Sequence, residues 1–157
     1  MSQPGFIDGL AFARGGSRVQ GVLTGKALPR LAEAVSRIGE VSYALRGGFN
    51  AREKPCLGVE ARADLELTCQ RCLGALLLPV SVAAELELSE DEREIAQAED
   101  DIDRVLATPA MQVAGLVEDE LLLALPDVPK HDSCVAPGDE RGGRGPSPFE
   151  ALKALKR

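Results

Sequence analysis

The most regular feature of the sequence is an alternation of apolar and other residues on both sides of a short turn. Over 57–67, and again over 76–88, every second position is apolar. Period two over this length predicts half-buried strands with one face exposed to water. Because only a short turn separates them, the two strands should form one long antiparallel hairpin. Pro79 has no N–H to donate, so the second strand should lie at a sheet edge there or carry a bulge.

Two other stretches show helical spacing. Apolar residues three or four apart predict a helix over 28–38, which Gly39 can end in a left-handed conformation. A stronger pattern predicts a helix over 109–125, with Thr108 as its cap and Pro109 in its first turn. On the first helix, Arg30 and Arg37 are interpreted as ordinary surface charge.

The remaining segments up to the long helix are less regular. We expect a short helix over 7–12, a strand over 18–23 and a strand over 41–45 that Gly47 and Gly48 end or bulge. Residues 89–103 are acidic and hold few apolar side chains, so they are interpreted as a mobile loop or a frayed helix.

The chain closes with a linker and an amphipathic helix. Residues 135–147 are rich in Gly, Pro and charge, which is typical of a flexible linker. Ser147 and Glu150 form a capping box for a helix over 148–157. That helix is too short to be stable alone, so it must dock on this domain or on a partner. Its apolar face consists of Phe149, Leu152 and Leu155.

Together these elements predict a single α+β domain over residues 1–134, followed by the linker and the terminal helix. In this fold an antiparallel sheet, led by the hairpin at 57–88, packs against the helix at 109–125.

Charge is unevenly distributed along the chain. The formal net charge is -7, but residues 61–140 hold five Lys or Arg against nineteen Asp or Glu, and both ends are basic. This pattern favours a basic partner for the middle and phosphate for the ends, although acidic runs often serve solubility alone. Aromatic residues make up only 3%, which disfavours single-stranded nucleic acid binding by base stacking.

The long helix carries one irregularity. Glu118, Asp119 and Glu120 interrupt its apolar stripe, and three acids in a row span most of a turn. At least one of them must therefore face inward or toward a neighbouring element. They can form a solvated face, or contact an Arg or a partner.

The sequence predicts a cytoplasmic location. No basic patch followed by an apolar run begins the chain, and no apolar run approaches the ~20 residues of a membrane span. Thiols stay reduced in the cytoplasm, which disfavours a disulfide within the hairpin turn.

The candidate chemistry lies at that turn. Cys69 and Cys72 can bind one side of a tetrahedral zinc ion, serve as structural thiols or act in redox chemistry. Redox activity is disfavoured because the pair lies between strands, without the helix N-terminus that lowers a thiol pKa. His131 and Cys134 could supply the other two ligands of a structural zinc site. Cys56 lies outside this set and is interpreted as a buried apolar residue.

Three motifs, LTCQRCL, VEDELLLALPDVPKHDSC and PSPFEALKALK, resemble the bacterial YceD family of large ribosomal RNA subunit accumulation proteins. The resemblance implies a cytoplasmic assembly or processing factor that is not a catalyst, partnered with a large-subunit ribosomal protein or a ribosomal RNA precursor. Some members carry a richer cysteine cluster where this chain has only His131 and Cys134.

The leading hypothesis is therefore a non-enzymatic ribosome biogenesis factor without a membrane partner or a small-molecule substrate. The acids at 118–120 and the apolar face of the terminal helix are its candidate partner contacts. The alternatives are a zinc-stabilised interaction module unrelated to ribosomes and a thiol redox protein using Cys69 and Cys72.

Overall fold

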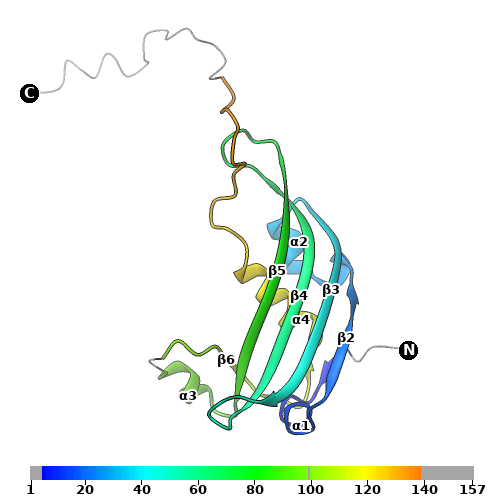
Figure 1. Cartoon of the computed structure of the whole chain (residues 1–157), viewed down its shortest axis with the longest axis vertical. Coiled ribbons are helices and arrows are strands. Elements are labelled where there is room, and N and C mark those ends of the chain that lie inside the picture. The colour runs from blue at the N-terminus through cyan, green and yellow to red at the C-terminus, as the bar shows by residue number, and fades with distance from the viewer. Residues whose placement is uncertain (1–4, 99, 139–157) are drawn as a thin grey trace, which may run out of the picture.

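A curved five-stranded sheet forms the body of the protein (Figure 1). The computed structural model describes residues 5–98 and 100–138. All neighbouring strands are antiparallel except the last pair, in which β6 runs parallel to β5. In spatial order the strands are β2 (Arg18–Leu23), β3 (Arg37–Phe49), β4 (Pro55–Thr68), β5 (Ala75–Ser89) and β6 (Arg104–Leu106).

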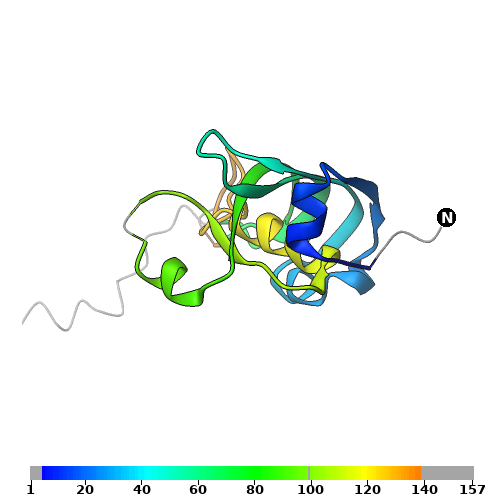
Figure 2. The same cartoon turned by 90° about the horizontal axis from the view of Figure 1, so that it is seen from below.

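Short elements surround this sheet. Both views place α2 and α4 on the same face of the sheet, and Figure 2 shows α4 within its curve. This arrangement confirms the α+β class. The short elements are β1 (Phe6–Ile7), α1 (Gly9–Arg14), η1 (Gly25–Ala27), α2 (Pro29–Ala34), α3 (Glu92–Ala96), β7 (Met111–Gln112) and α4 (Val113–Leu123).

The hairpin expected from the alternating pattern is confirmed. Strands β4 and β5 pair in one antiparallel ladder from Cys56 opposite Glu87 to Thr68 opposite Ala75. The inward residues of β4 join the core, where Leu57 and Leu65 are fully buried beneath α4 and its neighbours.

Pro79 lies on the outer edge of the sheet, as its missing N–H predicted. It faces Asp64 on β4, and among the described residues β5 pairs on its other side only at Glu87–Ser89. Pro79 therefore costs the sheet no ladder hydrogen bond on that side.

The helix predicted over 28–38 was too long. Helix α2 ends at Ala34, and β3 begins at Arg37. The backbone N–H of Ser36 already donates to the carbonyl of Glu66 at 2.7 Å. Pairing with β4 therefore outweighs the helical spacing of the apolar residues, and the strand predicted over 41–45 is the centre of a longer one.

The long helix begins later than its pattern predicted. Helix α4 starts at Val113, with Gln112 at its N-cap, so Thr108 and Pro109 lie before it. Residues Met111 and Gln112 instead pair with β1, which holds them extended. At the other end, the helix stops at Leu123, two residues before the predicted end.

The first part of the chain follows the predictions more closely. The strand over 18–23 is confirmed as β2. The short helix expected over 7–12 is present as α1, shifted to Gly9–Arg14, and the Asp8 carboxylate accepts a hydrogen bond from the N–H of Ala11 at its start.

The acidic segment contains the single short helix α3, capped by Asp91. It is followed by an ion pair between Asp100 and Arg104. The predicted terminal helix at 148–157 and most of the predicted linker at 135–147 lie outside the described residues.

Gly47 and Gly48 neither end β3 nor bulge it; the register instead shifts between Ile38 and Val41. Helix α1 passes directly over Gly47. A Cβ added there would overlap the carbonyl oxygen of Phe12 and lie 2.7 Å from the Cα of Ala13, whereas one at Gly48 would meet nothing within 4 Å.

We expect Gly47→Ala to lower the free energy of unfolding by about 2 kcal/mol, because backbone atoms of α1 cannot yield as a flexible side chain would. The matched control Gly48→Ala should stay within about 0.5 kcal/mol of wild type. Urea denaturation followed by circular dichroism measures both. Equal effects of the two substitutions would contradict the close approach of α1 to β3.

Candidate metal centre

Two segments far apart in the sequence meet at the tip of the long hairpin: the turn between β4 and β5, and the extended chain that follows α4 (Figure 1). The turn is closed by backbone hydrogen bonds from Cys69 N–H to the Gly74 carbonyl and from Leu73 N–H to the Cys69 carbonyl, each 2.9 Å. Leu73 has a φ of 62°, which lets the chain reverse at this point. The closed turn presents the thiols of Cys69 and Cys72.

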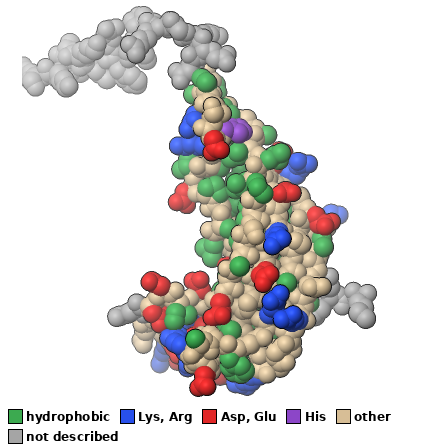
Figure 3. Space-filling view, in the orientation of Figure 1, with side chains coloured by type: hydrophobic (Ala, Val, Ile, Leu, Met, Phe, Trp, Pro, Cys, Tyr) green, Lys and Arg blue, Asp and Glu red, His purple; other side chains and the backbone are tan. Residues whose placement is uncertain are grey.

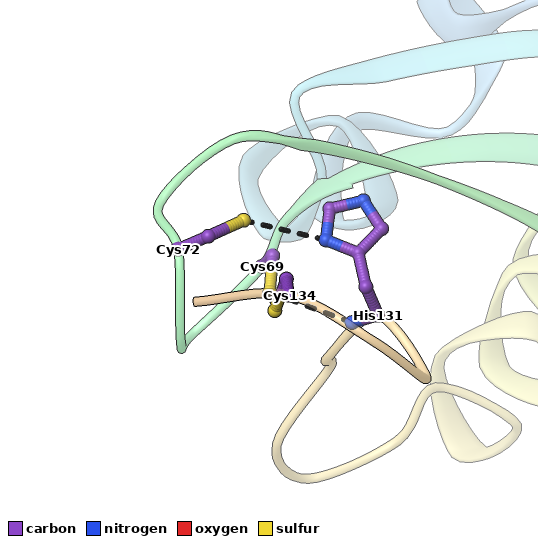
Figure 4. A group of neighbouring side chains, drawn as sticks. All are labelled: Cys69, Cys72, His131 and Cys134. Carbon is purple, nitrogen blue, oxygen red and sulfur yellow. Dashed lines mark hydrogen bonds between the residues drawn. The ribbon is translucent and has the colours of Figure 1, made fainter. Parts of the chain in front are cut away.

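The extended chain is attached to this turn by its own backbone. The N–H of Gln70 donates to the carbonyl of Pro129 at 2.8 Å, and the N–H of His131 donates to the sulfur of Cys69 at 3.4 Å. These contacts bring His131 and Cys134 next to the turn (Figure 4).

All four predicted ligands therefore meet. The ligand atoms of Cys69, Cys72, His131 and Cys134 lie within 4.8 Å of one another. The Sγ atoms of Cys69 and Cys134 are 3.7 Å apart, and Cys72 Sγ lies 3.3 Å from His131 Nδ1.

These distances fit a tetrahedral metal ion. A zinc ion about 2.3 Å from sulfur and about 2.0 Å from nitrogen would separate two sulfurs by about 3.8 Å and a sulfur from a nitrogen by about 3.5 Å. The cluster could therefore hold a metal ion once its more distant ligand atoms, up to 4.8 Å apart, draw together.

The surrounding groups orient the ligands. His131 Nε2 lies 2.9 Å from the carbonyl oxygen of Ala75, which can only accept, so Nε2 carries the proton and Nδ1 is left as the metal-binding nitrogen. The backbone N–H groups of Arg71 and His131 both donate to Cys69 Sγ at 3.4 Å. Such donors favour a thiolate over a thiol.

The thiols consequently differ in acidity. Burial opposes the charged form of Cys69, but hydrogen bonds from the backbone of Cys72, His131 and Arg71, and from the Cys72 side chain, outweigh it and lower its pKa to about 5. Burial raises the pKa of Cys134, and the neighbouring side chains of Cys69 and Cys72 raise it further. One thiolate is thus available for a metal ion at neutral pH, before any metal binds.

Cys56 takes no part in the cluster. It is buried on β4, as expected. Burial raises the pKa of its thiol, and the nearby charges of Glu85 and Glu87 raise that pKa further.

The three consecutive acids of α4 separate into different environments. Glu118 points inward, with 3% of its surface exposed, and accepts hydrogen bonds from the Arg30 side chain and the Leu31 backbone N–H. Asp119 is exposed and also pairs with Arg30, while Glu120 is half-buried. The expectation that one acid faces inward is confirmed, and its contact ties α4 to α2.

Arg30 was missed as a functional contact because its place on the open side of a helix is typical of ordinary surface charge. Its role could have been inferred only by pairing it with the acids that interrupt the α4 stripe. The carbonyl of Ala75 could not have been found from sequence, since backbone groups carry no residue-type signal.

Comparison with known proteins adds one finding. A family model described as "Large ribosomal RNA subunit accumulation protein YceD" matches residues 57–156, which include the hairpin, α4 and all four cluster residues. No solved structure matches the chain. Within the described part of the chain, no helix is long and apolar enough to cross a membrane.

We expect metal-free protein to develop one thiolate with a midpoint near pH 5, because the pKa of Cys69 is lowered to about 5, against about 8.5 for an ordinary cysteine. The ultraviolet absorbance of the thiolate measures this titration. Cys69→Ser should abolish the low-pH step, and Cys56→Ser should keep it. A first step near pH 8 to 9 would contradict the hydrogen-bonded environment described for Cys69.

Proposed function

We propose that this chain, which belongs to the YceD family of large ribosomal RNA subunit accumulation proteins, is a non-enzymatic ribosome biogenesis factor. In this role it supports the accumulation or processing of large-subunit ribosomal RNA. The observation that carries the proposal is the family match, which spans 57–156. The family is described by an effect on ribosomal RNA and not by a reaction, which favours a binding role.

The proposed partner is a large-subunit ribosomal protein or a ribosomal RNA precursor, and the proposed place of binding is the cytoplasm. Charge supports a basic protein for the middle of the chain, where acids outnumber bases over 61–140. Some of these acids are already paired internally, among them Glu118 with Arg30 and Asp100 with Arg104. The exposed acids of 89–103, including Glu90 and Asp101, stay available to a partner.

We further propose that the four-residue cluster holds a structural zinc ion. Three thiolates and one imidazole form a recognised structural zinc set, and a site with four protein ligands leaves no open position for substrate. The role of these residues would be structural and not catalytic. They would fasten the hairpin tip to the chain that follows α4, a segment in which the described residues form no helix or strand after Leu123.

A metal test separates this role from redox activity. Protein purified without chelator should carry about one zinc per chain, and Cys72→Ser should lose most of it and melt at least about 5 °C lower, since metal binding contributes directly to folding. Elemental analysis and calorimetry measure the two effects. Cys56→Ser, which removes a cysteine outside the cluster, should keep the zinc.

Two observations together would contradict the structural role and favour the redox alternative: the wild-type protein contains no zinc, and Cys69 and Cys72 form a disulfide reversibly. Zinc binding without any effect on ribosomal RNA, measured next, would leave a zinc-stabilised module unrelated to ribosomes.

The ribosomal role is tested by complementation. In cells that lack the gene, the full chain should restore the ratio of large- to small-subunit ribosomal RNA, and affinity purification should enrich pre-ribosomal particles.

Cys56→Ser should restore the ratio, and Cys72→Ser should restore it only partly, because the hairpin tip is released. Neutralising the acids of 89–103 should reduce recovery of ribosomal proteins. A wild-type chain that leaves the ratio unchanged would refute the proposal.

A further inference from the structure

A groove with an apolar floor and an acidic rim lies between β6 and α4. Its volume is ≈ 360 Å³. One of its lining residues, Leu123, is an unusually open leucine with 79% of its surface exposed. The lining residues are Leu86, Asp103, Arg104, Val105, Asp119, Glu120, Leu122 and Leu123.

The negative charge of this groove is only partly balanced: Asp119 pairs with Arg30 of α2, which leaves Asp103 and Glu120. Arg104 is the one cation among its lining residues, but its side chain is only 8% exposed and is bound to Glu87 and Asp100. Burial raises the pKa of Glu120, and the nearby charges of Asp103 and Asp119 raise it further. A cation placed here would relieve that repulsion.

A second groove, of ≈ 440 Å³, lies at the hairpin tip, and its largely apolar lining also includes Lys130, His131 and Asp132. It is formed by Leu76–Leu78 of β5 and by the chain from Pro126 to Asp132. Leu77 is 67% exposed and Val128 is 53% exposed.

The two grooves are joined by further apolar surface. Val82 and Ala84 of β5 and Leu125 after α4 lie between them in sequence and are half-buried. Apolar side chains gather along the flank that β5 forms (Figure 3). The flank thus offers an apolar strip that starts beside the metal centre and ends at the acids.

We propose that residues 148–157 of this chain dock along this flank. Phe149, Leu152 and Leu155 would cover the apolar strip, and Lys153 and Lys156 would lie against the acidic rim. The two sets of residues that the sequence marked as partner contacts, the acids of α4 and the apolar face of the terminal segment, would then contact each other.

The sequence of the segment matches the groove in pattern. At 3.6 residues per turn, the apolar residues form one stripe. Lys156 falls within that stripe and Lys153 falls at its side, whereas Arg157 lies toward the opposite face. Lysines on and beside an apolar stripe complement a groove whose lining combines apolar and acidic side chains.

Chain length and direction also fit. The described chain reaches Gly138, four residues after the cluster ligand Cys134, so the segment approaches from the hairpin tip. The nine residues 139–147 can span at most about 30 Å, and a helix of ten residues is about 15 Å long. The linker is therefore long enough for the segment to dock with its basic end toward the acids.

Because residues 139–147 tether the segment to the domain, a weak contact with the flank is sufficient for docking. A short flexible linker gives an effective concentration on the order of millimolar, so docking requires an intrinsic dissociation constant of only about 1 mM. Burial of three apolar side chains can supply this affinity.

The test is photo-crosslinking in the full chain, with Phe149 replaced by a photoreactive phenylalanine analogue. We expect crosslinks within one chain to the flank, such as to Leu77, Val82 or Leu122, identified by mass spectrometry. Glu120→Lys should reduce their yield about fivefold. Adding Lys156→Glu to that variant should restore the yield, because the charges are exchanged.

Glu60→Lys is the matched control, since it makes the same charge change at an exposed position on β4 and should leave the yield unchanged. Four outcomes would each overturn the proposal. These are crosslinks to other surfaces, crosslinks only between chains, no crosslinks at all, and a crosslink yield that stays the same when the charge of Glu120 is reversed. The measurement uses the isolated chain, so it is independent of the ribosomal RNA assay.

Discussion

The region around the hairpin tip depends on one contact. There the turn between β4 and β5 is attached to the chain that follows α4. The apolar core extends along β4 only as far as Leu67, with Cys69 at its end, and the last buried residue of α4 is Leu121. Beyond these points the two segments have little apolar surface to share. Three thiols and an imidazole take the place of a core there, together with the hydrogen bond from Gln70 to Pro129.

Elsewhere the apolar core holds the fold, supplemented by two buried carboxylates with cationic partners. Glu118 joins α4 to α2 through Arg30, and Glu87 on β5 binds Arg52 and Arg104. Among the described residues, no buried side-chain nitrogen or oxygen lacks a hydrogen-bond partner. Removing either carboxylate would leave buried donors or an unpaired charge, which is why such groups usually fix one arrangement of their elements. The acids that stay uncompensated are those at the surface, where a partner can reach them.

Local patterns predicted the parts of the fold that depend on local physics. The alternation over 57–67 and 76–88 identified the hairpin because a strand with one buried face requires period two whatever its neighbours are. Cys69 continues the parity of the inward residues of β4 and is buried like them. Boundaries were predicted less well, since Arg37 and Met111 are drawn into strands by partners distant in sequence. Helical spacing at 28–38 and the Thr108–Pro109 signal describe what those residues prefer alone, and pairing overrides such preferences.

The sequence by itself determined the residue types of the candidate centre, the long hairpin that carries half of it and the acidic character of the middle of the chain. Only the tertiary structure decided that His131 and Cys134 reach the tip, that Ala75 orients the imidazole and that Glu118 meets Arg30, a contact 88 residues apart in the chain. It also decided that β6 runs parallel to β5 and, among the described residues, pairs with only Glu87–Ser89 of that edge. The physical reason is that these features arise from contacts between segments whose separation no local period encodes. Each such contact forms only when the sheet and α4 have placed its two sides together.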